Sequence, residues 1–147
     1  MKQIKLKVIT PERLVLEEMV DQVSLPTTEG EITILPEHIP LISALASGDL
    51  VAVSAGEHIP MAISGGFVEI KNEADGVTTV AVLADFAEQV AELTDEAVEK
   101  ARARAEELKK EMEGKESIDF EHFAAELERS LTRVKVADRW RKRKYRK

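Results

Sequence analysis

The sequence predicts a β + α fold: a flattened β-sandwich or barrel over residues 1–86, then an antiparallel two-helix hairpin over residues 87–147. All five prolines and six of the seven glycines lie in the first 76 residues, where short runs alternate between polar and apolar side chains. From about residue 88, apolar residues instead recur every three or four positions. Short strands broken by frequent turns are typical of a sandwich or barrel, and the longer spacing predicts amphipathic helices.

The first predicted strand covers residues 4–8, where Ile4, Leu6 and Val8 alternate with lysines. Such alternation indicates a strand with one buried face. Further short strands are predicted, in order, at VDQVSLP, EITILP, DLVAVS, MAIS, FVEIK and VTTVAVLA, with turn signals at 10–13, 26–28, 47–49, 55–57 and 72–76. Gly65-Gly66 predicts a bulge or a close approach of two backbones, because glycine has no Cβ.

The first predicted helix spans about 94–113, with Thr94 as its N-cap and Asp95 and Glu96 in its first turn. Negative charge there suits the helix dipole. Its apolar stripe comprises Val98, Ala101, Ala105, Leu108 and Met112.

The second predicted helix spans about 119–138, with Asp119 as its cap and a polar link, EGKES, before it. Its expected stripe comprises Phe120, Ala124, Leu127, Leu131 and Val134. Each helix therefore has one narrow seam, and the pair is expected to form a hairpin. Because the first seam is rich in alanine, we expect the hairpin to dock marginally and to open at modest cost.

Composition excludes several classes of protein. There is no cysteine, so disulfides and thiolate chemistry are absent, and no apolar run is long enough to cross a membrane. The formal net charge is −8 over 1–86, −8 over 87–128 and +9 over 129–147. An acidic body with a basic tail argues against nucleic-acid binding, because most of the molecule would repel phosphate.

Catalytic motifs are scarce: the sequence has no Walker A loop, GxGxxG, HExxH or GxSxG pattern. The stretch EGEITILPEHIPLI, residues 29–42, gathers Glu29, Glu31 and His38 between prolines. It has two interpretations, a metal or acid–base site and a rigid surface for another protein. We favour the surface, and we predict no catalytic residue and no bound metal.

The basic tail, RVKVADRWRKRKYRK, interleaves cations with Trp140 and Tyr145. It has three interpretations: a segment that docks on an acidic protein surface, a solvated helix end, and a stacking platform for nucleic acid. We rank them in that order.

Several blocks together carry a specific resemblance. They are ITPERLVLEEMVDQVSLPTTEGEITILPEHIPLISAL at 9–45, ISGGFVEI at 63–70, VLAD at 82–85, ARARAEELKK, and the RxxxRVKVA run at 129–137. In this order they resemble the epsilon subunit of bacterial F-type (rotary) ATP synthases, over nearly the whole chain.

The resemblance implies a non-catalytic central-stalk (rotor) subunit of a proton-translocating ATP synthase, with H⁺ or Na⁺ left open as the coupling ion. Its β domain would dock on the gamma subunit and rest against the loops of the membrane c-ring, with Glu31 and His38 in the docking region. The chain would sit peripherally at the cytoplasmic face of the bacterial cell membrane, reaching the membrane only through the complex.

The resemblance also implies that the hairpin regulates. Folded on the sandwich it would permit ATP hydrolysis, and extended it would insert among the alpha and beta subunits and inhibit. Arg129, Arg133 and Lys135 are the candidates for that inhibitory contact.

Some members of the family bind ATP on the folded hairpin, through an Ile/Leu-Asp-x-x-Arg-Ala motif. Here the motif is degraded: after Leu93, Thr94, Ala97 and Val98 replace its Asp, Arg and Ala. The other matching positions are Glu88, Arg104, Arg129 and Arg133. Because a lost arginine removes a charge-assisted contact, we predict weak or absent ATP binding and no other cofactor.

Two other classes of function stay open. Salt-dependent retention on DNA or RNA that is lost without residues 139–147 would favour a nucleic-acid adaptor. A ligand-dependent melting shift in residues 1–86 alone would favour a small-molecule-binding domain.

Overall fold

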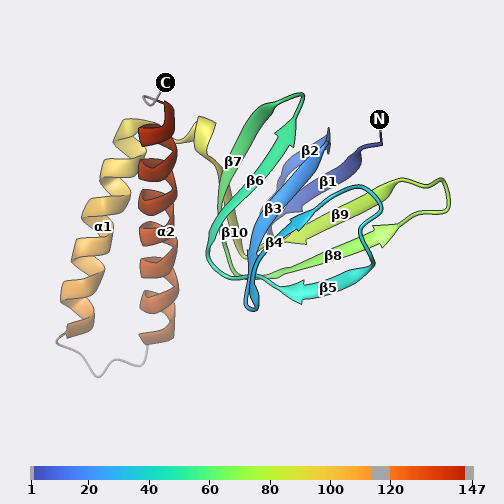
Figure 1. Cartoon of the computed structure of the whole chain (residues 1–147). Coiled ribbons are helices and arrows are strands. Elements are labelled where there is room, and N and C mark those ends of the chain that lie inside the picture. The colour runs from blue at the N-terminus through green and yellow to red at the C-terminus, as the bar shows by residue number, and fades with distance from the viewer. Residues whose placement is uncertain (1, 114–119, 145–147) are drawn as a thin grey trace.

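The chain changes from strands to helices at about residue 90. The computed structural model describes residues 2–113 and 120–144, and within them ten strands are followed by a 3₁₀ turn and two long helices (Figure 1). The strands are β1 (Ile4–Ile9), β2 (Leu14–Val20), β3 (Gln22–Thr27), β4 (Gly30–Ile34), β5 (Leu41–Ala44), β6 (Gly48–Ser54), β7 (Glu57–Ser64), β8 (Phe67–Asn72), β9 (Thr78–Leu83) and β10 (Phe86–Gln89). The helical elements are η1 (Val90–Glu92), α1 (Asp95–Glu113) and α2 (Phe120–Lys144).

The strands form two five-stranded sheets packed face to face. The first, which we call sheet A, has the order β2-β1-β9-β8-β5, and the second, sheet B, has the order β10-β7-β6-β3-β4. The pairing of β1 with β9 is parallel, and the other pairings are antiparallel. The sheets stay separate, so the architecture is a sandwich and not a closed barrel. β10 continues to Gln89, past the predicted boundary at 86/87.

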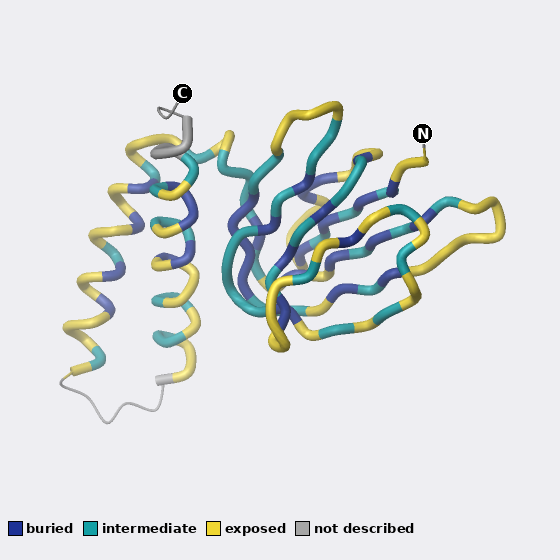
Figure 2. Tube along the Cα trace, viewed as in Figure 1, coloured by how far each residue is buried: buried dark blue, intermediate teal, exposed yellow. Residues whose placement is uncertain are grey.

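The core lies between the two sheets. It is filled by the apolar side chains that alternate with more exposed residues along the strands (Figure 2). Ile4, Leu6 and Val8 are fully buried, as their spacing predicts. The corresponding residues of sheet B include Val23, Leu25, Leu50, Met61 and Ile63. Burying such side chains is the main favourable term in holding the two sheets together.

The glycine pair before β8, Gly65-Gly66, lies where its backbone closely approaches the backbone of Leu83 and Ala84. Gly66 has a φ of +96°, and a Cβ built on it would lie 2.0 Å from the carbonyl oxygen of Leu83. The Gly66 carbonyl accepts a hydrogen bond from the Leu45 amide at 2.9 Å. The close approach predicted for Gly65-Gly66 is therefore present.

α1 begins and packs as its sequence predicts. The Ala97 amide donates to Thr94 Oγ1 at 3.0 Å, so Thr94 is the N-cap. Val98, Ala101, Ala105 and Leu108 are buried along one stripe, and Met112, the last member of the predicted stripe, is half-buried.

α2 departs from its prediction in two ways. It continues to Lys144, well past the expected end near residue 138. Its buried residues are Ser130, Thr132, Val136 and Ala137, whereas Leu131 of the predicted stripe is exposed. The physical reason is position: α2 lies between α1 and sheet B, so it buries two faces and not one seam (Figure 1). The predicted cap Asp119 lies outside the described residues.

No helix in the two described ranges is long and apolar enough to span a membrane.

Candidate functional site: the face where the hairpin docks

The outer face of sheet B carries two carboxylates that receive α2. Asp49 of β6 and Glu88 of β10 both pair in register with Ala62 of β7. They therefore flank Ala62 on the same face, because directly paired residues point to the same side of a sheet. Ala62 is buried and small, which lets the helix approach β7 between two negative groups.

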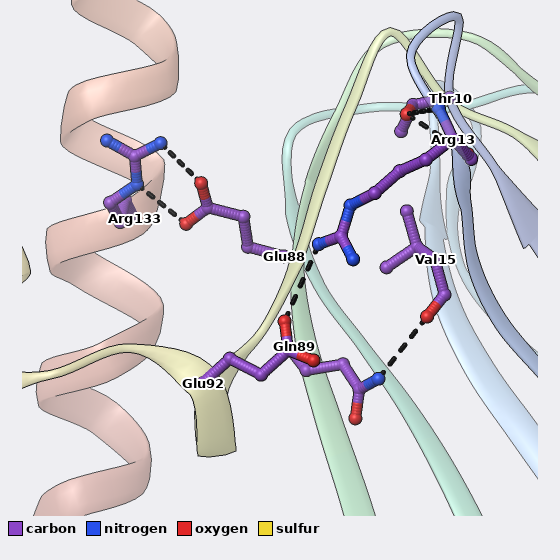
Figure 3. Close-up of polar contacts among 7 residues, drawn as sticks. All are labelled: Thr10, Arg13, Val15, Glu88, Gln89, Glu92 and Arg133. Atoms are coloured by element: carbon purple, nitrogen blue, oxygen red, sulfur yellow. Dashed lines mark hydrogen bonds and ion pairs between the residues drawn. The ribbon is translucent and has the colours of Figure 1, made fainter.

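Glu88 binds Arg133 through two hydrogen bonds. Arg133 Nε donates to Oε2 at 2.8 Å and Nη2 to Oε1 at 2.6 Å, and Figure 3 shows the two side chains facing each other between β10 and α2. Each side chain is 27 % exposed. The guanidinium also lies 5.1 Å from the centre of the Phe86 ring. Such a two-pronged, partly buried pair is among the stronger ionic contacts in proteins.

Asp49 binds the far end of α2. Arg139 Nη1 donates to Asp49 Oδ1 at 2.7 Å, and Trp140 Nε1 donates to Oδ2 at 3.1 Å. The Trp140 ring also lies 5.8 Å from the His58 ring. A third polar contact, from Ser47 Oγ to Glu128 Oε1 at 2.7 Å, ties the middle of the helix to the start of β6.

The segment that joins the sandwich to the hairpin is anchored separately. Arg13 pairs with Glu92 at 3.5 Å, and Gln89 Nε2 donates to the Val15 carbonyl at 3.4 Å (Figure 3). The side chain and backbone of Thr10 bond to the backbone of Arg13 and hold the preceding turn. These contacts place the base of the hairpin beside β2, so movement of the helices is expected to begin beyond η1.

Two salt bridges join α1 to α2. Arg104 Nε donates to Glu126 Oε1 at 2.7 Å, and Arg102 Nη2 lies 3.2 Å from Asp138 Oδ2. The hydrogen bond that Arg104 donates to Glu126 lowers the pKa of Glu126, and the same bond, with a second one that Arg104 donates to Glu107, raises the pKa of Arg104. Asp138 likewise raises the pKa of Arg102.

The predicted nucleotide residues converge around two hollows beside this interface. One, of about 340 Å³, is lined by Glu88, Leu93 and Arg133, and the other, of about 480 Å³, by Arg104, Arg129 and Arg133. Two of these three arginines are already paired inside the chain, because Arg133 is bound by Glu88 and Arg104 by Glu126, whereas Arg129 is exposed. Thr94, at the motif's acidic position, caps α1.

Of the three residues predicted to contact catalytic subunits, only Arg133 is held in this interface. Arg129 and Lys135 are exposed on α2. Lys135 lines a groove of about 750 Å³ together with Ala124, Leu127, Leu131 and Val134. Four residues of the predicted apolar stripe thus face an open groove and not a closed seam.

Glu31 and His38 lie in different parts of the sandwich. Glu31 is exposed on β4 of sheet B and lines a hollow of about 300 Å³ with Asp49 and Arg139, on the side of the hairpin. His38 is half-buried in the loop before β5, with its Nδ1 2.7 Å from the Ile39 carbonyl oxygen.

The loop around His38 is pinned to sheet A. Asn72 Nδ2 donates to the His38 carbonyl at 2.9 Å, and the Glu37 amide donates to Thr78 Oγ1 at 2.7 Å. Glu37 has a φ of +71° and also pairs with Lys2. Beside it, Ile39 and Ile42 are 72 % and 68 % exposed. This is a stiff segment that presents apolar side chains to solvent.

An apolar row on the outer face of sheet A was missed by sequence reasoning. Strand register brings Leu14, Ile9, Leu83, Phe67 and Ala44 side by side across all five strands of that sheet. Leu14, Phe67 and Leu83 are exposed. Only the strand pairing reveals the row, because its members are scattered between Ile9 and Leu83 and single exposed apolar residues carry no signal.

Within residues 2–113 and 120–144, no group of three or more His, Asp or Glu side chains is placed to hold a metal ion.

Comparison with known proteins identifies relatives over most of the chain. Residues 3–90 match the family described as ATP synthase, Delta/Epsilon chain, beta-sandwich domain. The ATP synthase epsilon chain of Herpetosiphon aurantiacus is 40 % identical over 134 residues, covering 91 % of this chain and 93 % of the relative. That of Dehalococcoides mccartyi is 40 % identical over 144 residues, covering 97 % of both.

Solved structures share the fold. A chain in the Euglena gracilis mitochondrial ATP synthase, OSCP/F1/c-ring, superposes with a TM-score of 0.57 at 23 % identity, covering 99 % of this chain and 83 % of that one. A chain in the Tetrahymena thermophila mitochondrial ATP synthase central stalk/c-ring superposes with a TM-score of 0.52 at 14 % identity, covering 95 % and 98 %.

Proposed function

This chain belongs to the ATP synthase delta/epsilon family, and from that premise we propose that it is the non-catalytic epsilon subunit of a bacterial proton-translocating ATP synthase. It would sit in the rotor, couple rotation of the membrane ring to the catalytic head, and restrain ATP hydrolysis through its hairpin. It would lie at the cytoplasmic face of the cell membrane, held there by the complex.

The docking surface on gamma is assigned to the outer face of sheet A and the loop beside it. The apolar row from Leu14 to Ala44, with Ile39 and Ile42 beside it, is the kind of exposed patch that marks a protein interface. The pinned loop adds stiffness, and His38 lies in it. Transmitting torque requires such a surface, because a compliant loop would absorb the movement. Glu31, which lies on sheet B, is assigned to the polar loops of the ring.

The regulatory role is carried by one observation: α2 is docked, yet it keeps unused binding capacity. Ala124, Leu127, Leu131 and Val134 line an open groove, and Arg129 and Lys135 stay exposed. An apolar stripe flanked by cations suits a second position against the alpha and beta subunits, where Arg129, Arg133 and Lys135 would make ionic contacts. Arg133 would first have to leave Glu88.

ATP is assigned no strong role in holding the docked state. The hairpin is already tied to the sandwich by Arg133–Glu88 and internally by Arg104–Glu126, so a nucleotide would have to displace carboxylates from both arginines. The docked state is thus held by the chain's own ion pairs.

ATP hydrolysis by the assembled complex tests the regulatory role. Full-length protein is compared with a version that ends at Glu92, which keeps β10 and its pairing with β7. We expect the truncated version to stay bound to gamma and to raise hydrolysis. Unchanged hydrolysis with the truncated chain still bound would rule out inhibition by the helices and leave a coupling role.

A further inference from the structure

We propose that Asp49 is a latch that holds the C-terminal end of α2 on the sandwich and so competes with any other partner of that end. The proposal rests on the proposed function, since it concerns the regulation of the same hairpin. It assigns a role to Asp49, Arg139 and Trp140, which the proposed function does not use.

Asp49 depends on α2 for its hydrogen bonds while the helix is docked. Its side chain is then 14 % exposed, and a carboxylate withdrawn from water needs hydrogen bonds to offset its lost hydration. Within the described ranges, its two side-chain hydrogen bonds come from Arg139 and Trp140, one on each oxygen. If α2 leaves, both bonds are lost together.

The latch acts at a second point along the helix. Arg133 binds β10, and Arg139, six positions later, binds β6 on the other side of Ala62. At a rise of about 1.5 Å per residue the two points are roughly 9 Å apart. One contact would let α2 pivot, whereas two contacts on different strands fix its direction. The second contact exists because α2 continues past residue 138.

Asp49 competes with other acidic groups for the basic C-terminal end of the chain. Residues 129–147 carry ten Lys or Arg and one acidic residue, so this end is attracted to any acidic surface. While Asp49 holds Arg139, this end of the helix stays on the sandwich and away from such a surface. Removing Asp49 leaves the helix sequence unchanged and shifts the population toward the released state.

The test follows release of α2 in the isolated full-length protein. The chain has no cysteine, so Thr132→Cys introduces a single thiol at a buried position between α2 and the sandwich. This site is about two turns from Trp140, so its maleimide labelling rate reports release of the helix and not a local change. Asp49→Asn is then added to this background.

We expect Asp49→Asn to speed labelling by about tenfold, which corresponds to about 1.4 kcal/mol. The matched control is Glu73→Gln, which removes one charge from the exposed turn between β8 and β9 and should leave the rate unchanged. The charge swap of Asp49→Arg with Arg139→Asp should slow labelling again. A rate in Asp49→Asn equal to that of its parent would overturn the latch, and a swap as fast as Asp49→Asn would overturn the ion-pair assignment.

A second readout separates this latch from the proposed function. In the assembled complex, Asp49→Asn should lower ATP hydrolysis, because more of the hairpin is free to inhibit. Faster labelling with unchanged hydrolysis would keep the latch and contradict the inhibitory role. Unchanged labelling would remove the latch, while the truncation ending at Glu92 would still decide the function.

Discussion

At the scale of residues, Arg133 has been assigned roles that exclude one another. Sequence resemblance assigns it both to a nucleotide site and to an inhibitory contact, while the structure binds it to Glu88 across the hairpin interface. A guanidinium engaged by a carboxylate through two bonds has little left to offer a phosphate. The docked state, the expected nucleotide contact and the proposed inhibitory contact would therefore compete for the same group.

The first prediction tests that pair. Glu88→Gln keeps the shape of the side chain but removes its charge, leaving Arg133 partly buried beside a weaker partner. We expect the docked hairpin to lose about 1–3 kcal/mol, which is typical of a lost hydrogen bond to a charged group. Hydrogen exchange of α2 amides in the isolated chain measures the loss. A double-mutant cycle with Arg133→Met isolates the pair, and a coupling near zero would contradict the assignment.

The second prediction concerns pH. Arg104 lowers the pKa of Glu126 in the folded chain, so the unfolded chain takes up this proton first as pH falls. The stability that Glu126 contributes is thus fully present above about pH 4.3 and is lost as pH drops through the folded pKa. Thermal melting of the full chain and of Glu126→Gln is compared from about pH 7 to about pH 3. The difference in melting temperature between the two proteins should be constant above about pH 5 and shrink below it. A difference that stays constant over the whole range would contradict the prediction.

At the scale of elements, regular alternation was the reliable signal and irregular strands were missed. The strand from Ile4 was predicted because its buried side chains alternate without interruption. β2 was not predicted, because the register shift between Val8 and Ile9 sets both Val15 and Leu16 into buried positions and breaks the alternation. β5 is a four-residue edge strand, too short to show a period.

The helices show a different limit of sequence reasoning. A single seam was assumed for each helix, and α1 fits it because it contacts one neighbour. α2 has two neighbours, and each of its two buried faces includes a polar residue that no apolar pattern marks. Ser130 and Thr132 are two positions apart, so they point to nearly opposite sides of the helix. The docking partners Asp49 and Trp140 are 91 positions apart in sequence, so no local pattern could join them.

The third prediction tests the close approach beside β8. Gly66→Ala would set a Cβ 2.0 Å from a backbone oxygen, whereas Gly76→Ala, also at a positive φ of +86°, meets nothing within 4 Å. Both changes carry the cost of that φ, about 1–2 kcal/mol, so their difference isolates the clash. We expect Gly66→Ala to lower the free energy of unfolding by at least about 2 kcal/mol more than Gly76→Ala. Urea denaturation followed by far-UV circular dichroism measures both, and equal losses would mean that the backbones separate easily.

At the scale of the whole molecule, the two faces of the sandwich divide the work. The outer face of sheet A presents an apolar row, and the hairpin packs against the outer face of sheet B over β7 and β6 (Figure 1). The proposed attachment to gamma and the proposed regulation therefore use opposite faces, whereas Glu31, which is assigned to the ring, lies on the hairpin side of sheet B. Under the proposed function, a change in the hairpin would leave the attachment to gamma undisturbed. A subunit that stays bound while it switches would need this separation.

The fourth prediction follows from the hairpin's internal ion pairs and concerns ATP. A ligand present at a hundred times its Kd stabilises the folded state by about 2.7 kcal/mol, which a melting experiment detects easily. Because Arg133 and Arg104 are already bound by carboxylates, and Ala97 stands where ATP-binding relatives of the family have an arginine, we expect about 1 mM ATP with Mg²⁺ to leave the melting of the isolated chain unchanged. Titration calorimetry provides a second measurement. A clear stabilisation that is lost in Arg129→Ala would instead mean that the nucleotide displaces the internal pairs, and the docked state would then respond to ATP as well as to its own latch.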